Sequence, residues 1–450
     1  MTDDMGLRLQ RDVDEKEFRQ AVENLLRSVA PVLEANPRYR GEAVIERLIE
    51  PERIVTFRVP WTDDQGRIRV NRGYRVEMSS VLGPYKGGVR FHPSVNQSII
   101  KFLAFDQIFT NALTTMPLGA AAGGSDFDPK GKSDNEVMGF CQSYMRELYR
   151  HIGANTDVLS GDIGVGAREI GYLYGMYRKL ANAVTGVITG KGLGWGGSLL
   201  RPEAAGYGCV YFAAEMLARA GLSLNGMACL VSGSGKLAQA IAEKLIEQGA
   251  KVLTLSDSGG HIHDPAGLDA EKLAFVKQLK NVQRGSIEAY AQQYAHAEYI
   301  PFDPQQPFNP LWSHRADCVF PAAAEYEIGQ RDGYNLINNH IKLFCEGSNM
   351  PCTADAMALL TDKKSILYGP AKAVNAGGAA VAGLEMAQNN MRLSWTREEV
   401  DERLKLVMHS IHRTCLEAAE QHGQPGNYVH GADIAGFIRV AEAIIDQGIV

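Results

Sequence analysis

The sequence predicts an α/β protein of two domains, one of them built on a doubly wound parallel sheet. With 450 residues, the chain is about three times the usual domain size, which makes two substantial domains the first expectation. The second half alternates short apolar strands with helical stretches, as a parallel sheet with helices on both faces requires. A glycine-rich turn joins the first of these strands to its helix, which is typical of a dinucleotide-binding unit.

Composition and charge argue against several classes of protein. Apolar residues make up 45% of the chain and charged residues 22%, so we expect it to fold throughout. Its 46 basic and 52 acidic residues are mixed, without a basic block for nucleic acid. The start, "MTDDMGLRLQRDVDEKEF", is acidic and unlike a signal peptide, and no run of about 18 apolar residues predicts a membrane span. We expect a cytoplasmic protein with no nucleic-acid and no membrane partner.

Cysteine and histidine usage gives no sign of disulfides or metals. The seven cysteines are scattered, without a Cys-x-x-Cys pair, and an odd number cannot all pair within one chain. We expect them to be reduced core residues. His261 and His263 flank Ile262, but no cluster of carboxylates or thiolates accompanies them. We therefore expect both histidines to be turn residues, and we predict no metal.

The first half carries helical and hairpin patterns. Helical periodicity covers residues 16–34 and 41–49, and residues 53–80 alternate apolar and polar side chains around an Asp-Gln-Gly turn, which predicts a β-hairpin. A further helix is expected to begin with a cap at Ser94 and to end between residues 110 and 115.

A nearly side-chain-free stretch follows that helix. The sequence "MPLGAAAGGSDFDPKGK", residues 116–132, places three alanines between glycines and then turns acidic. We expect the alanine run to be a bare loop next to an active site. Asp126 and Asp128 are expected to be cap and turn residues that fix this loop.

The turn Gly233-Ser234-Gly235-Lys236-Leu237-Ala238 carries the nucleotide signal. It lies between a strand that ends at Val231 and a helix followed by Gly249, and Asp257 stands about 20 residues beyond the turn. Glycines let the backbone approach a pyrophosphate, whose charge the helix N-terminus stabilises, although an ordinary strand–helix turn is the alternative. Lys236, Ser256 and Ser258 could meet a 2′-phosphate, whereas Asp257 would favour a free ribose hydroxyl. We favour NADP(H) over NAD(H).

Six segments, taken in order, resemble one enzyme family. The chain is similar to the glutamate dehydrogenases, in particular the hexameric bacterial type within the Glu/Leu/Phe/Val dehydrogenase superfamily. The resemblance rests on "GPYKGGVRFHPSVNQSIIKFLAFDQ", "PLGAAAGGSDFDPKGKSDNEVMGFCQSYMRELYRHIG", "SGDIGVGAREIGYLYG", "GKGLGWGGSLLRPEAAGYG", "EGSNMP" and "NAGGAAVAGLEMAQN".

The resemblance implies a two-domain amino-acid dehydrogenase fold. Residues 1–204 and 425–450 would form a substrate and oligomerisation domain, and residues 205–424 a Rossmann-like nucleotide-binding domain with hinge helices. It also implies a small-molecule substrate, a nicotinamide cofactor and a homo-oligomer, expected to be a hexamer.

Carried over by position, the resemblance keeps two site residues and loses three. Lys86 matches the lysine that holds the distal carboxylate, and Asp162 the aspartate that handles the proton and the amino group. Thr110 stands where a second lysine binds the α-carboxylate, Ala122 where the catalytic lysine polarises the carbonyl, and Ala382 where a serine assists at the distal carboxylate.

The cofactor half departs from the family in the same way. Ala205 replaces a threonine, and residues 321–327, "PAAAEYE", lack the threonine, glutamine and asparagine that line the nicotinamide ribose in the family. Asn375 and the two glycines after it remain, and Asn375 is counted with the substrate-binding residues.

Three functions stay open at this point. The chain is an oxidoreductase with an altered substrate, such as an imine or an unusual oxo or amino acid, because a preformed iminium needs no carbonyl-polarising lysine. Alternatively, it is a catalytically inactive pseudoenzyme that serves as a scaffold or regulatory subunit. The third alternative is residual glutamate dehydrogenase activity through a water molecule in place of the lysine. The intact phosphate turn favours the first, since a scaffold has no need of it.

Overall fold

The computed structural model describes residues 15–450 as two compact units. The acidic start of the chain, residues 1–14, lies outside the described residues. The first unit holds the chain up to Arg201 together with residues 380–400 and 433–450, and the second holds residues 202–379 and 401–432. Residues 380–400 therefore belong to the first unit and not to the nucleotide-binding one as expected, because Met386 packs against Leu118 and Val158.

The sheet of the first unit has five strands in the order β1-β2-β4-β3-β5. The predicted hairpin is confirmed: β1 and β2 are antiparallel, and β2 continues antiparallel to β4, whereas β3 runs parallel to both β4 and β5. Pro60 lies in β1, the edge strand, where its missing N–H is tolerated. The strands are β1 Arg53–Thr62, β2 Ile68–Ser79, β3 Tyr85–Phe91, β4 Ala120–Ser125 and β5 Asp157–Gly161.

The alanine run is a central strand and not the expected loop. All six residues of β4 are buried, and the strand pairs with β2 on one side and with β3 on the other. Small residues permit this packing: a Cβ on Gly87 of β3 would lie 1.5 Å from the carbonyl oxygen of Ala121. The low side-chain content therefore reflects close strand packing, which the sequence pattern alone does not distinguish from a bare turn.

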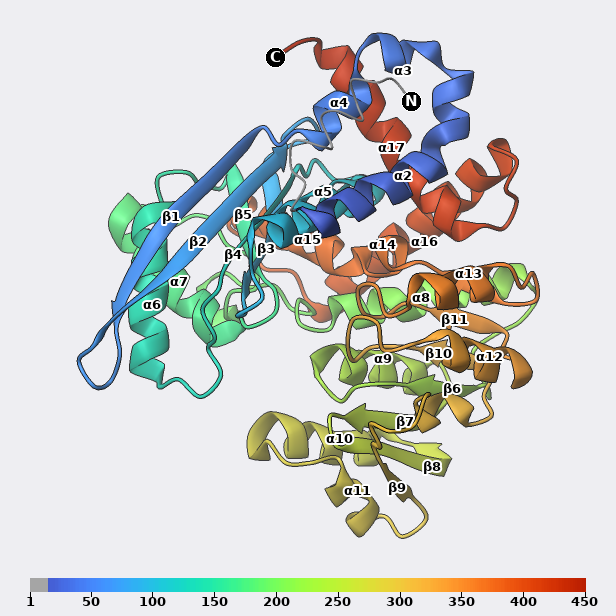
Figure 1. Cartoon of the computed structure of the whole chain (residues 1–450). Helices are drawn as coiled ribbons and strands as arrows, with labels where there is room; N and C mark the ends of the chain where they lie inside the picture. The colour runs from blue at the N-terminus through green and yellow to red at the C-terminus, as the bar shows by residue number, and fades with distance from the viewer. Residues whose placement is uncertain (1–14) are drawn as a thin grey trace. The chain divides into compact units, whose positions relative to one another are not determined.

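Helices cover both faces of this sheet, as Figure 1 shows for α6 and α7 on one side. On that side Phe127 and Phe140 stack with ring centroids 3.8 Å apart. Helix α5 covers the other face and begins at Gln97, later than expected, because the Asn96 side chain accepts the N–H of Ile99. The helices are α2 Lys16–Ala35, α3 Pro37–Gly41, α4 Val44–Ile49, α5 Gln97–Leu113, α6 Asp134–Leu148, α7 Ala167–Ala181, the 3₁₀ turn η1 Leu193–Trp195, α15 Ala376–Met391 and α17 Tyr428–Gln447.

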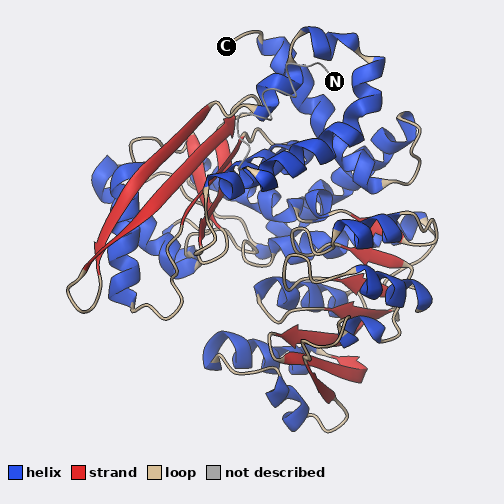
Figure 2. Cartoon of the chain, viewed as in Figure 1, coloured by secondary structure: helices blue, strands red, loops and turns tan. Residues whose placement is uncertain are grey.

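The second unit contains the doubly wound sheet, with strand order β12-β11-β10-β6-β7-β8-β9. Its core strands are parallel, as predicted, while β8 and β9 extend one edge antiparallel. Figure 2 shows helices on both sides of these strands. The strands are β6 Ala228–Val231, β7 Lys251–Asp257, β8 Gly260–Leu268, β9 Glu298–Pro301, β10 Cys318–Phe320, β11 Leu343–Cys345 and β12 Leu367–Gly369.

The helices of the second unit follow the expected β–α–β alternation. The first β–α–β motif consists of β6, α9 and β7. Gly249, with φ of 79°, follows the end of α9. The helices are α8 Ala204–Arg219, α9 Lys236–Glu247, α10 Ala270–Gln278, η2 Leu279–Gln283, α11 Glu288–Gln293, η3 Pro310–Ser313, α12 Gln330–Asn338, α13 Ala354–Thr361, α14 Ala371–Val374 and α16 Arg397–Gln421.

The cysteine prediction is confirmed, whereas the histidine prediction is wrong. All seven cysteines are buried and free. His261 and His263 lie within strand β8 and not in a turn, because both positions pair with β7 and β9. Their rings meet His314: the Nε2 atoms of His261 and His314 are 2.9 Å apart, and His263 stacks on His314 at 3.9 Å. Residues 15–450 include no group of three or more metal-ligating side chains that could hold an ion.

This histidine cluster should make the free energy of unfolding depend on pH. Burial, then the neighbouring imidazole, lowers the pKa of His261 and of His314 to about 4 from an ordinary value of 6.5. Both rings are neutral in the fold, so the unfolded chain binds more protons as the pH falls, and the free energy of unfolding should fall by up to about 5 kcal/mol between pH 6.5 and 4. Denaturant titrations across this range should show a shallower fall for a double variant with His261→Phe and His314→Phe. Replacing the exposed His296 with Gln should leave the slope unchanged; equal slopes in all three proteins would contradict the assignment.

Candidate functional site

One face of the first unit's sheet gathers three of the predicted catalytic and substrate-binding residues. Strand register places Lys86 and Arg90 of β3 on the same face as Ala122 of β4, the face that α5 covers. A Cβ on Gly88 would lie 2.9 Å from the Cβ of Asp162, so Asp162 flanks this face too. Chain segments that are distant in sequence therefore converge here, as the resemblance implied.

Lys86 is a buried amine without a counter-ion. Its side chain belongs to a residue that is 3% exposed, and within residues 15–450 its ammonium group has no hydrogen-bond or ion-pair partner. Burial, reinforced by the nearby guanidinium groups of Arg201 and Arg75, holds the pKa of Lys86 well below its ordinary value. Such a group is stabilised by an incoming anion, which would supply the missing opposite charge.

Arg201 is a second, half-buried cation on this site, and sequence reasoning missed it. Its Nε atom is buried without a hydrogen-bond partner, and burial lowers its pKa. Glu385 cannot serve it, because the Glu385 carboxylate is engaged by Lys191 Nζ at 2.8 Å and by the Gly190 N–H at 2.9 Å. The available signal was an arginine placed directly before a proline in the glycine-rich segment "GWGGSLLRPEAAGYG".

Asp162, the predicted proton-handling residue, is held by an arginine. Its Oδ2 atom lies 2.9 Å from Arg90 Nε, and its side chain is 28% exposed. The Asp162 N–H donates to the Val89 carbonyl at 3.1 Å, which fixes the turn after β5 against β3. The carboxylate is thus both positioned and partly accessible, as a group that exchanges protons with a ligand must be.

The three replaced positions add no charge. Ala122 is 4% exposed and Ala382 is 1% exposed, so both present only methyl groups. The Thr110 hydroxyl donates to the carbonyl of Asp106 at 3.4 Å, within its own helix. Lys86 and Arg201 are therefore the cations that remain available to an anionic ligand.

The phosphate turn in the second unit has the shape that the motif predicts. Gly233 has φ of 79°, and a Cβ there would lie 2.7 Å from the carbonyl oxygen of Ala322, so only glycine fits. Gly235 directly precedes α9, whose first helical residue is Lys236, and Ser234 and Leu237 complete the turn. This cradle fits a pyrophosphate, because the orphan N–H groups and the positive end of the helix dipole point outward from it.

Ser256 stabilises the turn itself. Its hydroxyl accepts the Gly233 N–H at 2.7 Å, and its own N–H donates to the Gly233 carbonyl at 3.0 Å. The serine therefore holds the turn in its shape, and its contact with a 2′-phosphate stays a prediction.

Asp257 is neutralised, which resolves the conflict among the ribose cues. Its carboxylate accepts from Lys280 Nζ at 2.8 Å and from the N–H groups of Ile287 and Gly259. Burial opposes ionisation, but these contacts hold the pKa of Asp257 below its ordinary value. The positive charge of Lys280 offsets the negative charge of Asp257, so the end of β7 would repel a 2′-phosphate less than a bare carboxylate would. Sequence reasoning missed Lys280, because only the folded segment after α10 brings it to the end of β7.

Asn375 presents an unsatisfied acceptor at the carboxyl edge of the same sheet. Its Oδ1 atom is buried without a hydrogen-bond partner, while its Nδ2 atom donates to Asn349 Oδ1 at 3.3 Å. Buried acceptors without a partner are rare in native proteins, so the Asn375 Oδ1 atom is open to a donor that residues 15–450 do not supply.

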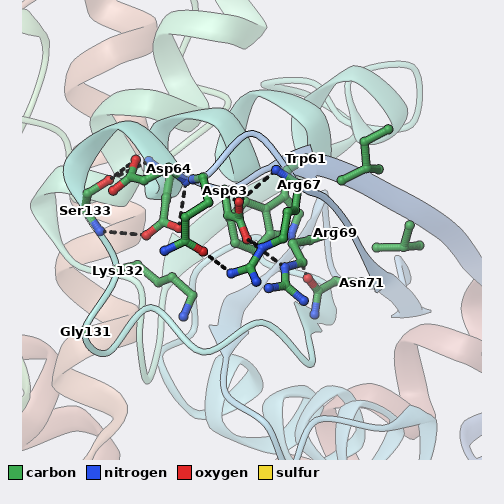
Figure 3. A pocket seen from close by; sticks show the side chains of 13 residues that line it. Trp61, Asp63, Asp64, Arg67, Arg69, Asn71, Gly131, Lys132 and Ser133 are labelled. Carbon is green, nitrogen blue, oxygen red and sulfur yellow. Dashed lines mark hydrogen bonds and ion pairs between the residues drawn. The ribbon is translucent and has the colours of Figure 1, made fainter.

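A polar hollow of about 1050 Å³ lies elsewhere, at the tip of the β1–β2 hairpin (Figure 3). Arg67 and Arg69 both pair with Asp63 across it, at 3.0 and 2.9 Å. Lys132 and Ser133, from the segment before α6, close the other side. None of the residues that line the hollow is a predicted site residue, so it is separate from the chemistry described above.

Comparison with known proteins decides the family. Residues 196–448 match Glutamate/Leucine/Phenylalanine/Valine dehydrogenase, and residues 51–179 match the Glu/Leu/Phe/Val dehydrogenase dimerisation domain. The chain belongs to the Glu/Leu/Phe/Val dehydrogenase family.

Similar proteins carry closely related names. The NADP-specific glutamate dehydrogenase of Giardia intestinalis is 53% identical over 98% of this chain and 97% of its own length. That of Haemophilus influenzae is 54% identical over 98% and 96%. The crystal structure of Plasmodium falciparum glutamate dehydrogenase matches this family member with a TM-score of 0.94 at 48% identity, covering 98% of this chain and 93% of that one. A hetero-hexameric glutamate dehydrogenase from Thermus thermophilus gives 0.82 at 27% identity, covering 97% and 98%.

Without a bound anion, the buried amine of Lys86 should lower the free energy of unfolding. Its folded pKa lies below the unfolded value, so the unfolded chain binds more protons and stability should rise with pH from neutrality toward 10.5. Lys86→Met removes this buried amine and should raise the free energy of unfolding at pH 7 by about 1–4 kcal/mol, with a flatter pH profile. Chemical denaturation at pH 7 and 9.5 measures both effects.

Lys191 provides the matched control. It is equally buried but pairs with Glu385 at 2.8 Å, so Lys191→Met strands a buried carboxylate and should destabilise the fold by about 3–5 kcal/mol. If both variants lose stability alike, Lys86 has a partner in solution and the anion-site interpretation fails.

Proposed function

We propose that this family member is an NADP(H)-dependent oxidoreductase that acts on a CH–NH or C=N group of a substrate other than glutamate. The proposal rests on which residues of the sheet face carry a positive charge. Lys86 is a buried cation and Arg201 a half-buried one, and both are placed to bind an anion, while Thr110 and Ala122 supply no positive charge. The site is thus prepared to bind an anionic group but lacks the second and third lysines that the resemblance assigns to glutamate chemistry.

The second unit supplies the cofactor site. The N–H groups around Gly233 and Gly235 would hold the pyrophosphate, and Lys280, having neutralised Asp257, would admit the 2′-phosphate. Bound there, the nicotinamide cofactor supplies hydride chemistry. The names of the relatives in Giardia and Haemophilus support the NADP(H) assignment.

The substrate face would bind glutamate weakly and oxidise it slowly. A carboxylate buried without a cation costs several kcal/mol, and only one cluster of cations is present for two carboxylates. A catalytic lysine contributes proton transfer and charge stabilisation, each worth a factor of about 10² to 10⁴ in rate, and Ala122 provides neither. An iminium substrate already carries positive charge, so it needs proton management alone, for which Asp162 is positioned by Arg90.

One observation favours a second candidate, a pseudoenzyme that acts as scaffold or regulatory subunit. The loop after β10 presents Ala323 and Ala324, which give a ribose no side-chain hydrogen bond. Glycine-only packing at Gly233 and the orphan Asn375 acceptor weigh against it, since neither benefits a scaffold. In either case we propose a cytoplasmic homo-oligomer, expected to be a hexamer; no helix within residues 15–450 combines the length and apolar character needed to cross a membrane.

A fluorescence titration tests the proposal. NADPH and NADH are titrated into the purified protein with and without 2-oxoglutarate. Tight binding of NADPH that does not respond to 2-oxoglutarate supports an enzyme with a different substrate, and hydride consumption then serves to screen imines and oxo acids. Binding of neither cofactor contradicts the proposal and favours the pseudoenzyme.

Restoring the missing cations should restore glutamate chemistry. The double variant Thr110→Lys and Ala122→Lys returns a charge for the α-carboxylate and a group that polarises the carbonyl. We expect NADP⁺-dependent glutamate oxidation at least ~10²-fold above the parent, measured as NADPH absorbance. The single variants should gain far less, because such groups act as a unit. No gain in the folded double variant would show that further pocket positions have changed.

Lys280 should decide cofactor choice. Lys280→Met removes the charge that neutralises Asp257 and exposes a 2′-phosphate to the bare carboxylate. We expect the Kd for NADPH to rise about 10- to 100-fold while the Kd for NADH changes less than about threefold, by fluorescence titration. Lys277→Met, which removes a nearby lysine paired with Glu243, is the control and should change neither. Equal losses for NADPH and NADH would contradict the assignment.

A further inference from the structure

Helix α10 leads into a turn of unusual geometry. The residues that follow it, η2 Leu279–Gln283, form a π-helical turn, in which the N–H groups of Arg284 and Gly285 both donate to the Leu279 carbonyl. Arg284 has φ of 56°, in the left-handed region. Single π-helical turns are rare and often lie at functional sites, so the side chains of this turn are candidates for a role beyond folding.

Two consecutive residues of the π-helical turn contact different parts of the candidate cofactor site. Lys280 pairs with Asp257 at the end of β7. Asn281 contacts Gln239 of α9 instead. The π-helical turn is therefore linked both to the end of β7 and to the helix that follows the glycine-rich turn.

Asn281 and Gln239 form a reciprocal pair of amides. Asn281 Nδ2 donates to Gln239 Oε1 at 2.9 Å, and Gln239 Nε2 donates to Asn281 Oδ1 at 3.1 Å. Gln239 is 4% exposed, whereas Asn281 lies at the surface. An amide nitrogen carries two hydrogens, and Gln239 Nε2 also donates to the Ser234 carbonyl at 2.8 Å. Asn281 therefore orients the amide that holds Ser234.

Gln239 binds the carbonyl oxygens of two consecutive residues of the glycine-rich turn. Its side chain donates to Ser234, and its backbone N–H donates to the Gly235 carbonyl at 2.9 Å. In a planar trans peptide, the C=O and the N–H that follows it point in opposite directions. Because the Ser234 carbonyl points to Gln239, the Gly235 N–H points away from it. Within residues 15–450 no acceptor takes this N–H, which leaves it for a ligand.

Building on the proposed cofactor site, we propose that Asn281 is a positioning residue for the pyrophosphate of the cofactor and that it acts through Gln239. The amide pair holds the Ser234–Gly235 peptide so that the Gly235 N–H is oriented before the anion arrives. Donors that are already oriented bind an anion more tightly than donors that must first be ordered. Lys280 acts on the 2′-phosphate, so the π-helical turn serves the pyrophosphate and the 2′-phosphate by separate routes.

Two ligands separate these routes and distinguish positioning from a structural role. NADH carries a pyrophosphate and no 2′-phosphate, whereas adenosine 2′-monophosphate carries a 2′-phosphate and no pyrophosphate. If the amide pair only tied the π-helical turn to α9, its removal would lower Tm and would weaken both ligands alike or neither. A positioning pair affects NADH alone.

The experiment uses the full-length protein and substitutions in the π-helical turn and α9. Asn281→Leu removes the amide, and Asn281→Asp is the milder change, because it keeps the acceptor for Gln239 Nε2 and removes only the donor. Lys280→Met, Gln239→Met and the double variant Asn281→Leu with Gln239→Met complete the series. Gln283→Leu removes an exposed amide from the same turn and is the matched control. Calorimetry gives the Kd values of NADH, NADPH and adenosine 2′-monophosphate, and Tm verifies folding.

The expected pattern is a crossed one. Asn281→Leu raises the Kd values of NADH and NADPH by the same factor, about three- to tenfold, and that of adenosine 2′-monophosphate by less than about twofold, with Asn281→Asp in between. Lys280→Met weakens adenosine 2′-monophosphate and leaves NADH within about threefold. The double variant loses no more NADH affinity than Gln239→Met, because Asn281 acts through Gln239. Gln283→Leu changes none of the three Kd values.

Three results overturn the inference and leave the proposed function intact. These are an unchanged Kd for NADH in the folded Asn281 variants, an equal loss for adenosine 2′-monophosphate, and a further loss of NADH affinity in the double variant beyond that of Gln239→Met. A parent protein that binds neither NADPH nor NADH overturns both the inference and the proposed function.

Discussion

The close approach of β3 to β4 is the constraint on which the first unit depends. Gly87 faces the carbonyl of Ala121 so tightly that a Cβ would fall 1.5 Å from the oxygen. With this contact, β4 occupies the middle of the sheet and α5 packs against the face of the sheet. Lys86, the residue before Gly87, is buried there. The same packing that makes the sheet compact therefore removes the Lys86 amine from water without providing a counter-ion, at the place where we propose that an anion binds.

Much of the fold follows from local patterns, and the failures have identifiable causes. The hairpin over residues 53–80 and the β6-α9-β7 unit were predicted because alternation and turn residues agree there. The alanine run was misjudged because small residues serve equally in a loop and in a crowded strand. The histidines of β8 were misplaced because the strand is defined by its pairing with β7 and β9, and the ring that they meet, His314, lies about 50 residues further along the chain.

The candidate site shows the same limit. Lys86, Asp162 and the glycine-rich turn were predicted as site residues from sequence because motifs carry them, and their roles stay predictions. Arg201 and Lys280 were not predicted from sequence. Arg201 is singled out by an Nε atom without a hydrogen-bond partner, and Lys280 by its ion pair with Asp257. Those properties arise only on folding. The cations of the first unit also differ in their partners: Lys191 and Arg90 form ion pairs, whereas within residues 15–450 Lys86 and Arg201 form none, and these two are the cations to which we propose that an anion binds.

Pro60 in the outermost strand has a consequence for behaviour at high concentration. A sheet edge offers a row of backbone donors and acceptors to any passing chain, and uninterrupted edges nucleate fibrils. Because Pro60 cannot donate, a strand that added to the edge of β1 would lose a backbone hydrogen bond or bend near Pro60, and continuous pairing would be confined to residues 53–59. Pro60 thus shortens the edge that β1 offers to another chain without removing it.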